Sequence, residues 1–118
     1  MIKGIGIDIV ELKRIERLMS KNERFVKRIL CEKELAEFKQ LSNERRKIEY
    51  VAGRFAAKEA FSKAIGTGIG ETNFIDIAVL NEPSGAPYLE VNGFEKKQLF
   101  VSISHSNDYA VAQVIITQ

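Results

Sequence analysis

Residues 54–64 combine charged side chains with a strong helix pattern. The segment is rich in Ala, Lys, Glu and Phe and contains neither Gly nor Pro, which predicts a helix. Steps of four residues lead from apolar Phe55 to Glu59 and then to Lys63. A carboxylate on the inward side of an amphipathic helix is unfavourable unless a partner pairs with it or coordinates it. Glu59 is therefore a candidate ligand.

A simpler interpretation of the same residues is an ordinary helix-stabilising ion pair. Glu59 and Lys63 are four residues apart, and such pairs stabilise helices by about 0.2–0.5 kcal/mol. On this pair alone the simpler interpretation is favoured, but a second carboxylate changes the balance.

The second carboxylate is Asp8, in a strand predicted over residues 2–10. Isoleucines alternate there with Gly4, Gly6 and Asp8. Asp is depleted in strand interiors, and glycine in a strand often marks the close approach of a ligand or another backbone. A solvated Asp at a strand end would explain the same pattern.

Together these residues suggest a site for a hard cation and phosphates. Mg²⁺ usually takes one or two carboxylates together with phosphate oxygens and water. Asp8 and Glu59 fit that ligand count, and Lys63 would neutralise a phosphate or serve a leaving group. The glycine-rich loop at 66–70 lacks a P-loop pattern, so a helix cap and turn is the favoured interpretation. Spacing alone does not establish that these residues meet.

The only histidine, His105, follows Val101 and Ile103 on one face of a predicted strand, with serines on the other face. A lone histidine in this setting is more often structural. The serines could bind a polar ligand or pair across the sheet.

A row of basic residues recurs at steps of three and four through two predicted helices, at 11–20 and 22–30. If these helices are roughly continuous, the basic residues form one positive stripe beside an apolar one. A solvated face or a docking surface for an acidic protein or nucleic acid would explain the stripe. The small net charge of +2 and the lack of a known nucleic-acid-binding motif weigh against nucleic acid. The basic residues are Arg14, Arg17, Lys21, Arg24 and Arg28, and the apolar ones are Ile15, Leu18, Phe25 and Ile29.

The whole pattern predicts a single α+β domain over residues 1–118, with a mostly antiparallel sheet packed against a long helix. A chain of 118 residues suits one domain, and 45% hydrophobic residues allow a core. Gly66 is placed to cap the long helix. Further helices are expected at about 32–41 and 44–65, and strands at about 74–80, 88–91, 99–106 and 109–117.

The single cysteine, Cys31, cannot form an internal disulfide, which favours a reducing compartment. No apolar run reaches the length of a membrane span, and the first residues lack the apolar block of a signal peptide. We therefore expect a soluble cytoplasmic protein without a membrane partner.

Four segments in order resemble the motifs of holo-[acyl-carrier-protein] synthases, the short bacterial class of 4′-phosphopantetheinyl transferases. The resemblance covers essentially the whole chain. One departure is Gly85-Ala86-Pro87, where the family frequently has Gly-Lys-Pro, and it weakens any role for a basic group in that turn. The segments are GIGIDIVE (4–11), RFAAKEAFSKA (54–64), GTG (66–68) and SISHS (102–106).

The resemblance implies an enzyme that moves the phosphopantetheine arm of coenzyme A to a serine hydroxyl of apo acyl carrier protein. It would release adenosine 3′,5′-bisphosphate and support fatty acid biosynthesis. Asp8 and Glu59 would hold Mg²⁺ against the coenzyme A diphosphate, and Lys63 would neutralise or protonate the leaving phosphate. Glu59 or a metal-bound water would take the serine proton, and the sequence does not separate these two.

The resemblance also implies contacts with both substrates and with other subunits. The family is typically trimeric with active sites at subunit interfaces, so Asp8 and Glu59 could lie on facing surfaces, even of different chains. The nucleotide and its phosphates would contact Arg54, Lys58, Lys63, Gly66, Thr67, Gly68, His105 and Ser106. The acidic carrier protein would dock on Arg14, Arg17, Arg24, Phe25, Arg28 and Ile29.

Two other functions are compatible with parts of the sequence. A non-catalytic module that binds coenzyme A or a nucleotide would retain the basic residues but needs no pair of carboxylates. A basic-helix protein that binds nucleic acid or another partner would explain the arginines but not Glu59 on an apolar face. The presence of both Asp8 and Glu59 favours the transferase.

Overall fold

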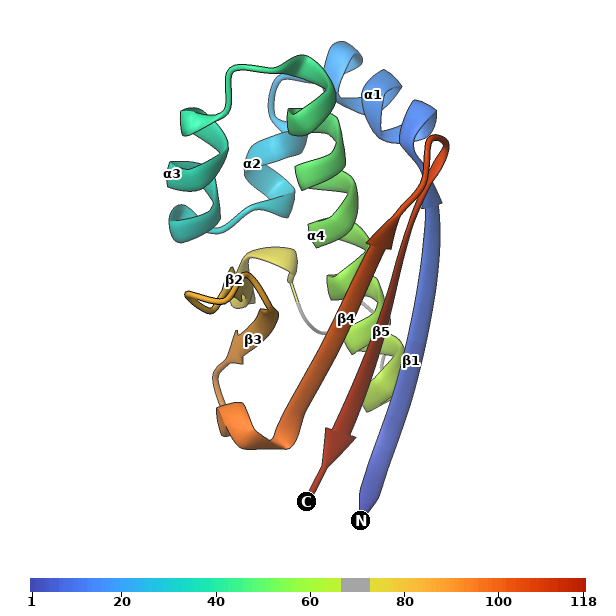
Figure 1. Cartoon of the computed structure of the whole chain (residues 1–118), viewed down its shortest axis with the longest axis vertical. Coiled ribbons are helices and arrows are strands. Elements are labelled where there is room, and N and C mark those ends of the chain that lie inside the picture. The colour runs from blue at the N-terminus through green and yellow to red at the C-terminus, as the bar shows by residue number, and fades with distance from the viewer. Residues whose placement is uncertain (67–72) are drawn as a thin grey trace.

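The computed structural model describes residues 1–66 and 73–118. Figure 1 shows one long helix lying along a face of the larger sheet, with shorter helices gathered near one end of it. The elements in chain order are β1 (Ile2–Glu11), α1 (Leu12–Lys21), α2 (Phe25–Ile29), α3 (Glu32–Gln40), α4 (Glu44–Ile65), the 3-10 turn η1 (Phe74–Asp76), β2 (Ile77–Asn81), β3 (Pro87–Val91), the 3-10 turn η2 (Lys96–Gln98), β4 (Leu99–His105) and β5 (Tyr109–Thr117).

The described strands pair in two antiparallel sheets. The larger sheet has the order β1-β5-β4, and β2 and β3 form a separate hairpin. The expected α+β class with antiparallel pairing is confirmed, and the division into two sheets is new. The hairpin contributes the fully buried residues Ile77, Val79 and Leu89 to the common core.

Helix α4 has the predicted boundaries and is capped at both ends. The Asn43 side chain accepts a hydrogen bond from the Arg46 N–H at 3.0 Å. At the other end Gly66 adopts the left-handed conformation with φ of 82°, as predicted for a helix cap. No helix in the described part of the chain is both long and apolar enough to cross a membrane.

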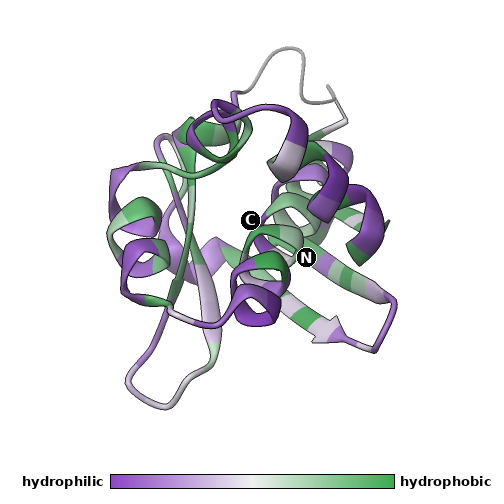
Figure 2. Cartoon of the chain, turned by 90° about the horizontal axis from the view of Figure 1, so that it is seen from above, coloured by the Kyte–Doolittle hydropathy of each residue, from purple (hydrophilic) through white to green (hydrophobic). Residues whose placement is uncertain are grey.

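The middle of α4 is buried on all sides, which differs from the single inward stripe that the sequence suggested. Residues 51–58 are all buried. Small residues such as Ala52 and Ala56 let the sheet approach one side and the helices and hairpin the other, so the helix forms the centre of the core. Seen from above in Figure 2, hydrophilic residues are prominent on the helices at the periphery.

Two expected elements begin or end elsewhere. The strand predicted from residue 74 starts at Ile77, because Phe74 turns in η1 to stack on Phe55 with ring centroids 5.3 Å apart. The two basic helices are not continuous, since Asn22 between them has extended backbone angles. The basic residues therefore lie on two short helices and not on one straight stripe.

Strand β1 crosses α4 at very close range. A Cβ atom on Gly6 would collide with the carbonyl oxygen of Ala60, and one on Gly4 with that of Ala64. The glycine face therefore meets another backbone, which is one of the two explanations that the sequence left open. Asp8 follows on the same face and is carried to the side of α4.

We expect Gly6→Ala to lower the free energy of unfolding by about 3 kcal/mol, the upper part of the usual range for overpacking. The added methyl group meets helix backbone, which cannot rotate away as a side chain would. Urea denaturation followed by circular dichroism measures the loss. Lys3→Ala, at an exposed position of the same strand, is the control. A Gly6→Ala protein within about 0.5 kcal/mol of wild type would show that the contact is not a tight one.

Candidate active site

Asp8, Glu59 and Lys63 meet where β1 crosses the end of α4. The Lys63 ammonium donates to Asp8 Oδ1 at 3.1 Å and to the Ile7 carbonyl oxygen at 3.0 Å. The Asp8 side chain is only 16% exposed, whereas that of Lys63 is 54% exposed. One chain thus supplies both carboxylates and the lysine.

Glu59 is partly sheltered, and its surroundings disfavour its charge. Burial raises its pKa first, and repulsion from the Asp8 carboxylate raises it further. The charges of Lys63 and Arg14 act in the opposite direction without cancelling the effect. Two carboxylates that repel one another in a half-buried position form a site that a cation would stabilise.

The donor set suits a hard divalent cation that is shared with a phosphate. Among the described residues no group of three or more His, Cys, Asp and Glu side chains is placed to enclose a metal. Asp8 and Glu59 would then supply two ligands of an open site, and the other positions would fall to phosphate oxygens and water. Mg²⁺ is usually bound in this way.

Arg14 was expected only on the docking surface, but it also reaches this site. Its guanidinium lies 5.7 Å from the ring centroid of Phe55, and its charge lowers the pKa of Glu59. Spacing along the helix could not have revealed this, because the contact depends on how α1 packs against α4.

Arg54 and His105 line a second small cleft. This cleft lies on the side of α4 opposite to the helical turn that carries Lys63. The Arg54 guanidinium stacks 3.8 Å above the Tyr50 ring centroid and donates to Asn81 Oδ1 at 2.9 Å. Its buried Nε–H has no partner in the described part of the chain. The cleft has a volume of about 250 Å³ and is lined by Arg46, Glu49, Tyr50, Arg54 and His105. It gathers two guanidinium groups and a histidine, as an anion would require.

His105 is held against α4. Its Nε2 lies 3.1 Å from the Glu49 carbonyl oxygen, and a Cβ on Gly53 would touch the imidazole ring. His105 therefore makes a structural contact with α4 and also lines a polar cleft.

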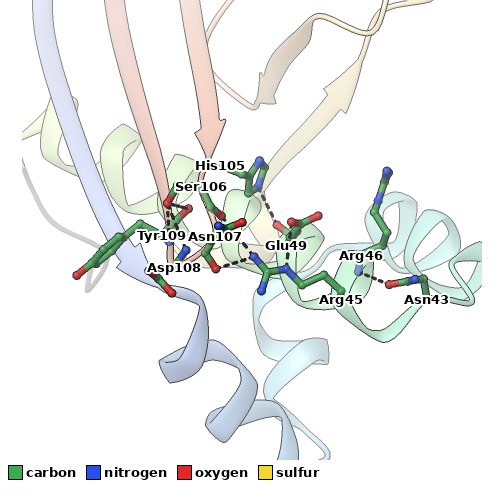
Figure 3. A network of polar contacts seen from close by, with 9 residues as sticks. All are labelled: Asn43, Arg45, Arg46, Glu49, His105, Ser106, Asn107, Asp108 and Tyr109. Carbon is green, nitrogen blue, oxygen red and sulfur yellow. Dashed lines mark hydrogen bonds and ion pairs between the residues drawn. The ribbon is translucent and has the colours of Figure 1, made fainter.

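The turn after His105 is anchored to the first residues of α4 (Figure 3). Arg45 donates to the Asn107 carbonyl oxygen at 2.6 Å and pairs with Glu49 at 3.3 Å. The Ser106 hydroxyl accepts the Tyr109 N–H at 3.0 Å, so it is occupied within the turn. Arg45, Arg46 and Tyr50 were not singled out from the sequence, because their roles depend on contacts with segments distant in the chain.

Lys58 has a different environment from the one expected. Its side chain is fully buried, and its ammonium donates to Glu34 Oε1 and to the Ile29 carbonyl oxygen, both at 2.6 Å. This burial argues against the expected contact with a nucleotide. Of the glycine-loop residues, Gly66 caps α4, and Thr67 and Gly68 lie outside the described residues.

Three of the expected docking residues, Phe25, Arg28 and Ile29, line an apolar groove of about 630 Å³. Phe55 lies between Phe25, at 6.5 Å between ring centroids, and Phe74. Ile29 is only 3% exposed, so it supports the groove from the core and offers little surface. Arg14, Arg17, Arg24 and Arg28 are exposed. The groove is lined by Phe25, Lys27, Arg28, Ile29, Phe55, Asn73, Phe74 and Ile75.

Similarity to known proteins assigns the family. The sequence model of the 4′-phosphopantetheinyl transferase superfamily matches residues 4–114. The holo-[acyl-carrier-protein] synthase of Geobacillus sp. is 61% identical over 117 residues, which cover 98% of this chain and 97% of that protein. The chain belongs to the holo-[acyl-carrier-protein] synthase family.

Solved structures of this family share the whole fold. The holo-(acyl-carrier-protein) synthase from Bacillus anthracis in complex with CoA (3′,5′-ADP) has a TM-score of 0.89 at 48% identity, over 100% of this chain and 99% of that one. The Helicobacter pylori enzyme in complex with coenzyme A has a TM-score of 0.82 at 34% identity, over 96% and 99% of the two chains. The resemblance drawn from the four sequence motifs is thereby confirmed.

We expect Glu59→Gln to raise the free energy of unfolding at pH 7.5, without divalent cations, by roughly 0.5 kcal/mol or more. The folded-state pKa of Glu59 is raised, so its ionised form opposes folding at neutral pH and its protonated form does not. The gain should disappear below about pH 4, near the unfolded pKa of a glutamate.

Urea denaturation at the two pH values in the presence of a chelator measures this difference. Glu16→Gln, at an exposed position of α1, serves as the control. A Glu59→Gln protein that is less stable than wild type at pH 7.5 would contradict the unfavourable environment that we assign to Glu59.

Proposed function

We propose that this member of the holo-[acyl-carrier-protein] synthase family transfers the 4′-phosphopantetheine arm of coenzyme A to a serine of apo acyl carrier protein. Adenosine 3′,5′-bisphosphate is the other product. The observation that carries the proposal is the meeting of Asp8, Glu59 and Lys63 at the crossing of β1 and α4. Relatives that carry the synthase name or bind coenzyme A support the choice of substrates.

Each of the three residues has a role that its surroundings suit. Asp8 and Glu59 would hold Mg²⁺, which when bound withdraws charge from the phosphorus under attack and stabilises the leaving oxygen. Glu59, with its raised pKa, is suited to take the proton of the attacking serine hydroxyl. As the new bond from the serine oxygen to phosphorus forms, the bond to the nucleotide phosphate breaks. Lys63 neutralises the charge that develops on that phosphate.

The nucleotide would lie against the polar cleft of α4. We assign contacts with its phosphates to Arg54 and His105, which line this cleft, and to Gly66, Thr67 and Gly68. Ser106 would contribute by stabilising the turn after His105, because its hydroxyl accepts backbone N–H groups there. These assignments follow the family resemblance, and the clustering of cationic groups supports them.

The acidic carrier protein would dock on α1 and α2. The arginines at 14, 17, 24 and 28 are exposed on these helices, and Arg28 and Phe25 line an apolar groove. Opposite charges guide the approach of a partner, and apolar contacts at the centre stabilise the complex. Ile29 is buried and supports the groove from the core.

We also propose that three copies assemble through the outer face of the larger sheet. Ile5, Ile7 and Ile9 are 55%, 58% and 63% exposed, and Phe100 on β4, across the central strand β5, is 56% exposed. Such a row of apolar side chains favours burial against another chain. Active sites would then lie at subunit interfaces, and the mass in solution, measured by sedimentation, tests the assembly.

The proposed cellular role is fatty acid biosynthesis in the cytoplasm, since acyl carrier protein is the acceptor. Cys31 is a free thiol, which fits a reducing compartment.

The first experiment is mass spectrometry of apo acyl carrier protein after incubation with this protein, coenzyme A and Mg²⁺. We expect the carrier to gain the mass of phosphopantetheine, and a chelator to prevent the gain. Asp8→Asn and Glu59→Gln should each reduce the rate by about 10²-fold or more. Glu90→Gln, on an exposed surface pair with Lys33, is the control. Near-normal turnover by either variant would contradict the assignment of the two carboxylates, and a protein that binds coenzyme A without any transfer would support the non-catalytic alternative.

Charge reversal tests the docking surface separately. Arg28→Glu should raise the KM for the carrier protein about tenfold, equivalent to ~1.4 kcal/mol, because it places a negative charge opposite an acidic partner. The KM for coenzyme A should stay unchanged. Lys97→Glu, at an exposed position of η2, changes the net charge equally and should affect neither constant. Equal effects of the two reversals would show that only the overall charge matters.

A further inference from the structure

Lys58 and Glu34 form a completely buried ion pair at the centre of the molecule. Both side chains are 0% exposed, and Lys58 Nζ lies 2.6 Å from Glu34 Oε1. The sequence analysis treated Lys58 as a nucleotide contact and did not single out Glu34. The activity proposed above uses neither residue.

The pair connects four parts of the fold. Lys58 on α4 also donates to the carbonyl oxygen of Ile29, the last residue of α2, at 2.6 Å. Glu34 on α3 accepts the Cys31 N–H at 2.9 Å with Oε1 and the Val79 N–H of β2 at 2.8 Å with Oε2. Both carboxylate oxygens therefore hold neighbouring backbone in place.

Stability alone does not explain such a pair. Taking two charges out of water is so unfavourable that well-packed apolar residues often stabilise a protein equally well or better. Desolvation lowers the pKa of Lys58 despite the attraction of Glu34, which reflects this penalty. What charged and directional groups add is a fixed geometry between the segments that they join.

The pair joins a segment that bears the proposed metal site to a segment that bears the proposed docking surface. Lys58 directly precedes Glu59 on α4, and Ile29 ends the helix that carries Phe25 and Arg28 on the proposed docking surface. We propose that Glu34 and Lys58 are positioning residues that set the carrier-docking helix α2 at a fixed place relative to Glu59. The inference rests on the proposed function and deepens it.

The chemical step explains why this placement matters. The serine oxygen arrives with the carrier protein on α1 and α2, whereas the phosphorus that it attacks lies near β1 and α4. Reacting atoms must come within about 3–3.5 Å in line, and a displacement of about 1 Å can slow a reaction by 10²-fold. Loosening the connection between α2 and α4 should therefore slow transfer without changing the affinity for coenzyme A, whose proposed contacts lie outside the pair.

The test is the double variant Glu34→Gln/Lys58→Met, because each single change leaves an unpaired charge in the core. Thermal unfolding is measured first, and kinetics are run well below the unfolding midpoint. We expect kcat for transfer to apo acyl carrier protein to fall about 30-fold or more. The Kd for coenzyme A, measured by calorimetry, should stay within about twofold of wild type. Lys33→Met, which breaks the exposed pair with Glu90, is the matched control and should change neither value.

Three results would overturn the proposal. A folded double variant with wild-type kcat would reduce the pair to a structural role. A loss of coenzyme A affinity similar to the loss of kcat would place Lys58 at the nucleotide instead. A wild-type protein that transfers nothing would overturn the proposed function and this role with it. If the double variant does not fold, Glu34→Gln/Lys58→Gln removes both charges, keeps an uncharged donor at position 58 and is judged by the same two readouts.

Discussion

The close contact between the glycine face of β1 and the backbone of α4 is the constraint on which the site depends. Because Gly4 and Gly6 carry no Cβ atom, for which there would be no room, the strand and the helix approach closely. This approach places Asp8 beside the helical turn that bears Glu59 and Lys63. Two carboxylates from distant parts of the sequence thereby share one small space. The raised pKa of Glu59, caused first by burial and then by repulsion from Asp8, follows from the geometry of the backbone.

The charged residues of α4 show how one buried helix can serve several purposes. Arg54 lies over Tyr50 in the polar cleft, Lys58 is sealed within the core, and Lys63 reaches Asp8 at the far end. Successive turns of the helix thus face a cleft, a buried pair and a half-open site. The helix can serve these purposes because it is surrounded on all sides, so each turn contacts a different neighbouring segment.

Much of the fold could be predicted from local pattern. The alternation in β1 and the Gly66 cap of α4 are determined by nearby residues, so these boundaries were found. The division into two sheets and the turn at Phe74 depend on packing between distant segments. The same distinction applies to the site. Asp8 was singled out as a carboxylate within a strand, and Glu59 as a carboxylate on the inward side of a helix. The burial of Lys58 could not be found, because its partner Glu34 lies 24 residues away in an ordinary helix sequence.

The two faces of β1 have a further consequence for how the chain folds. Isoleucines occupy one face and Gly4, Gly6 and Asp8 the other, and β1 pairs residue by residue with β5 from Gly4 to Glu11. A slip of one residue in this register would turn isoleucines toward the helix backbone and Asp8 toward the outside. The chain therefore cannot mispair β1 and still pack α4, which makes correct folding and assembly of the carboxylate pair a single event.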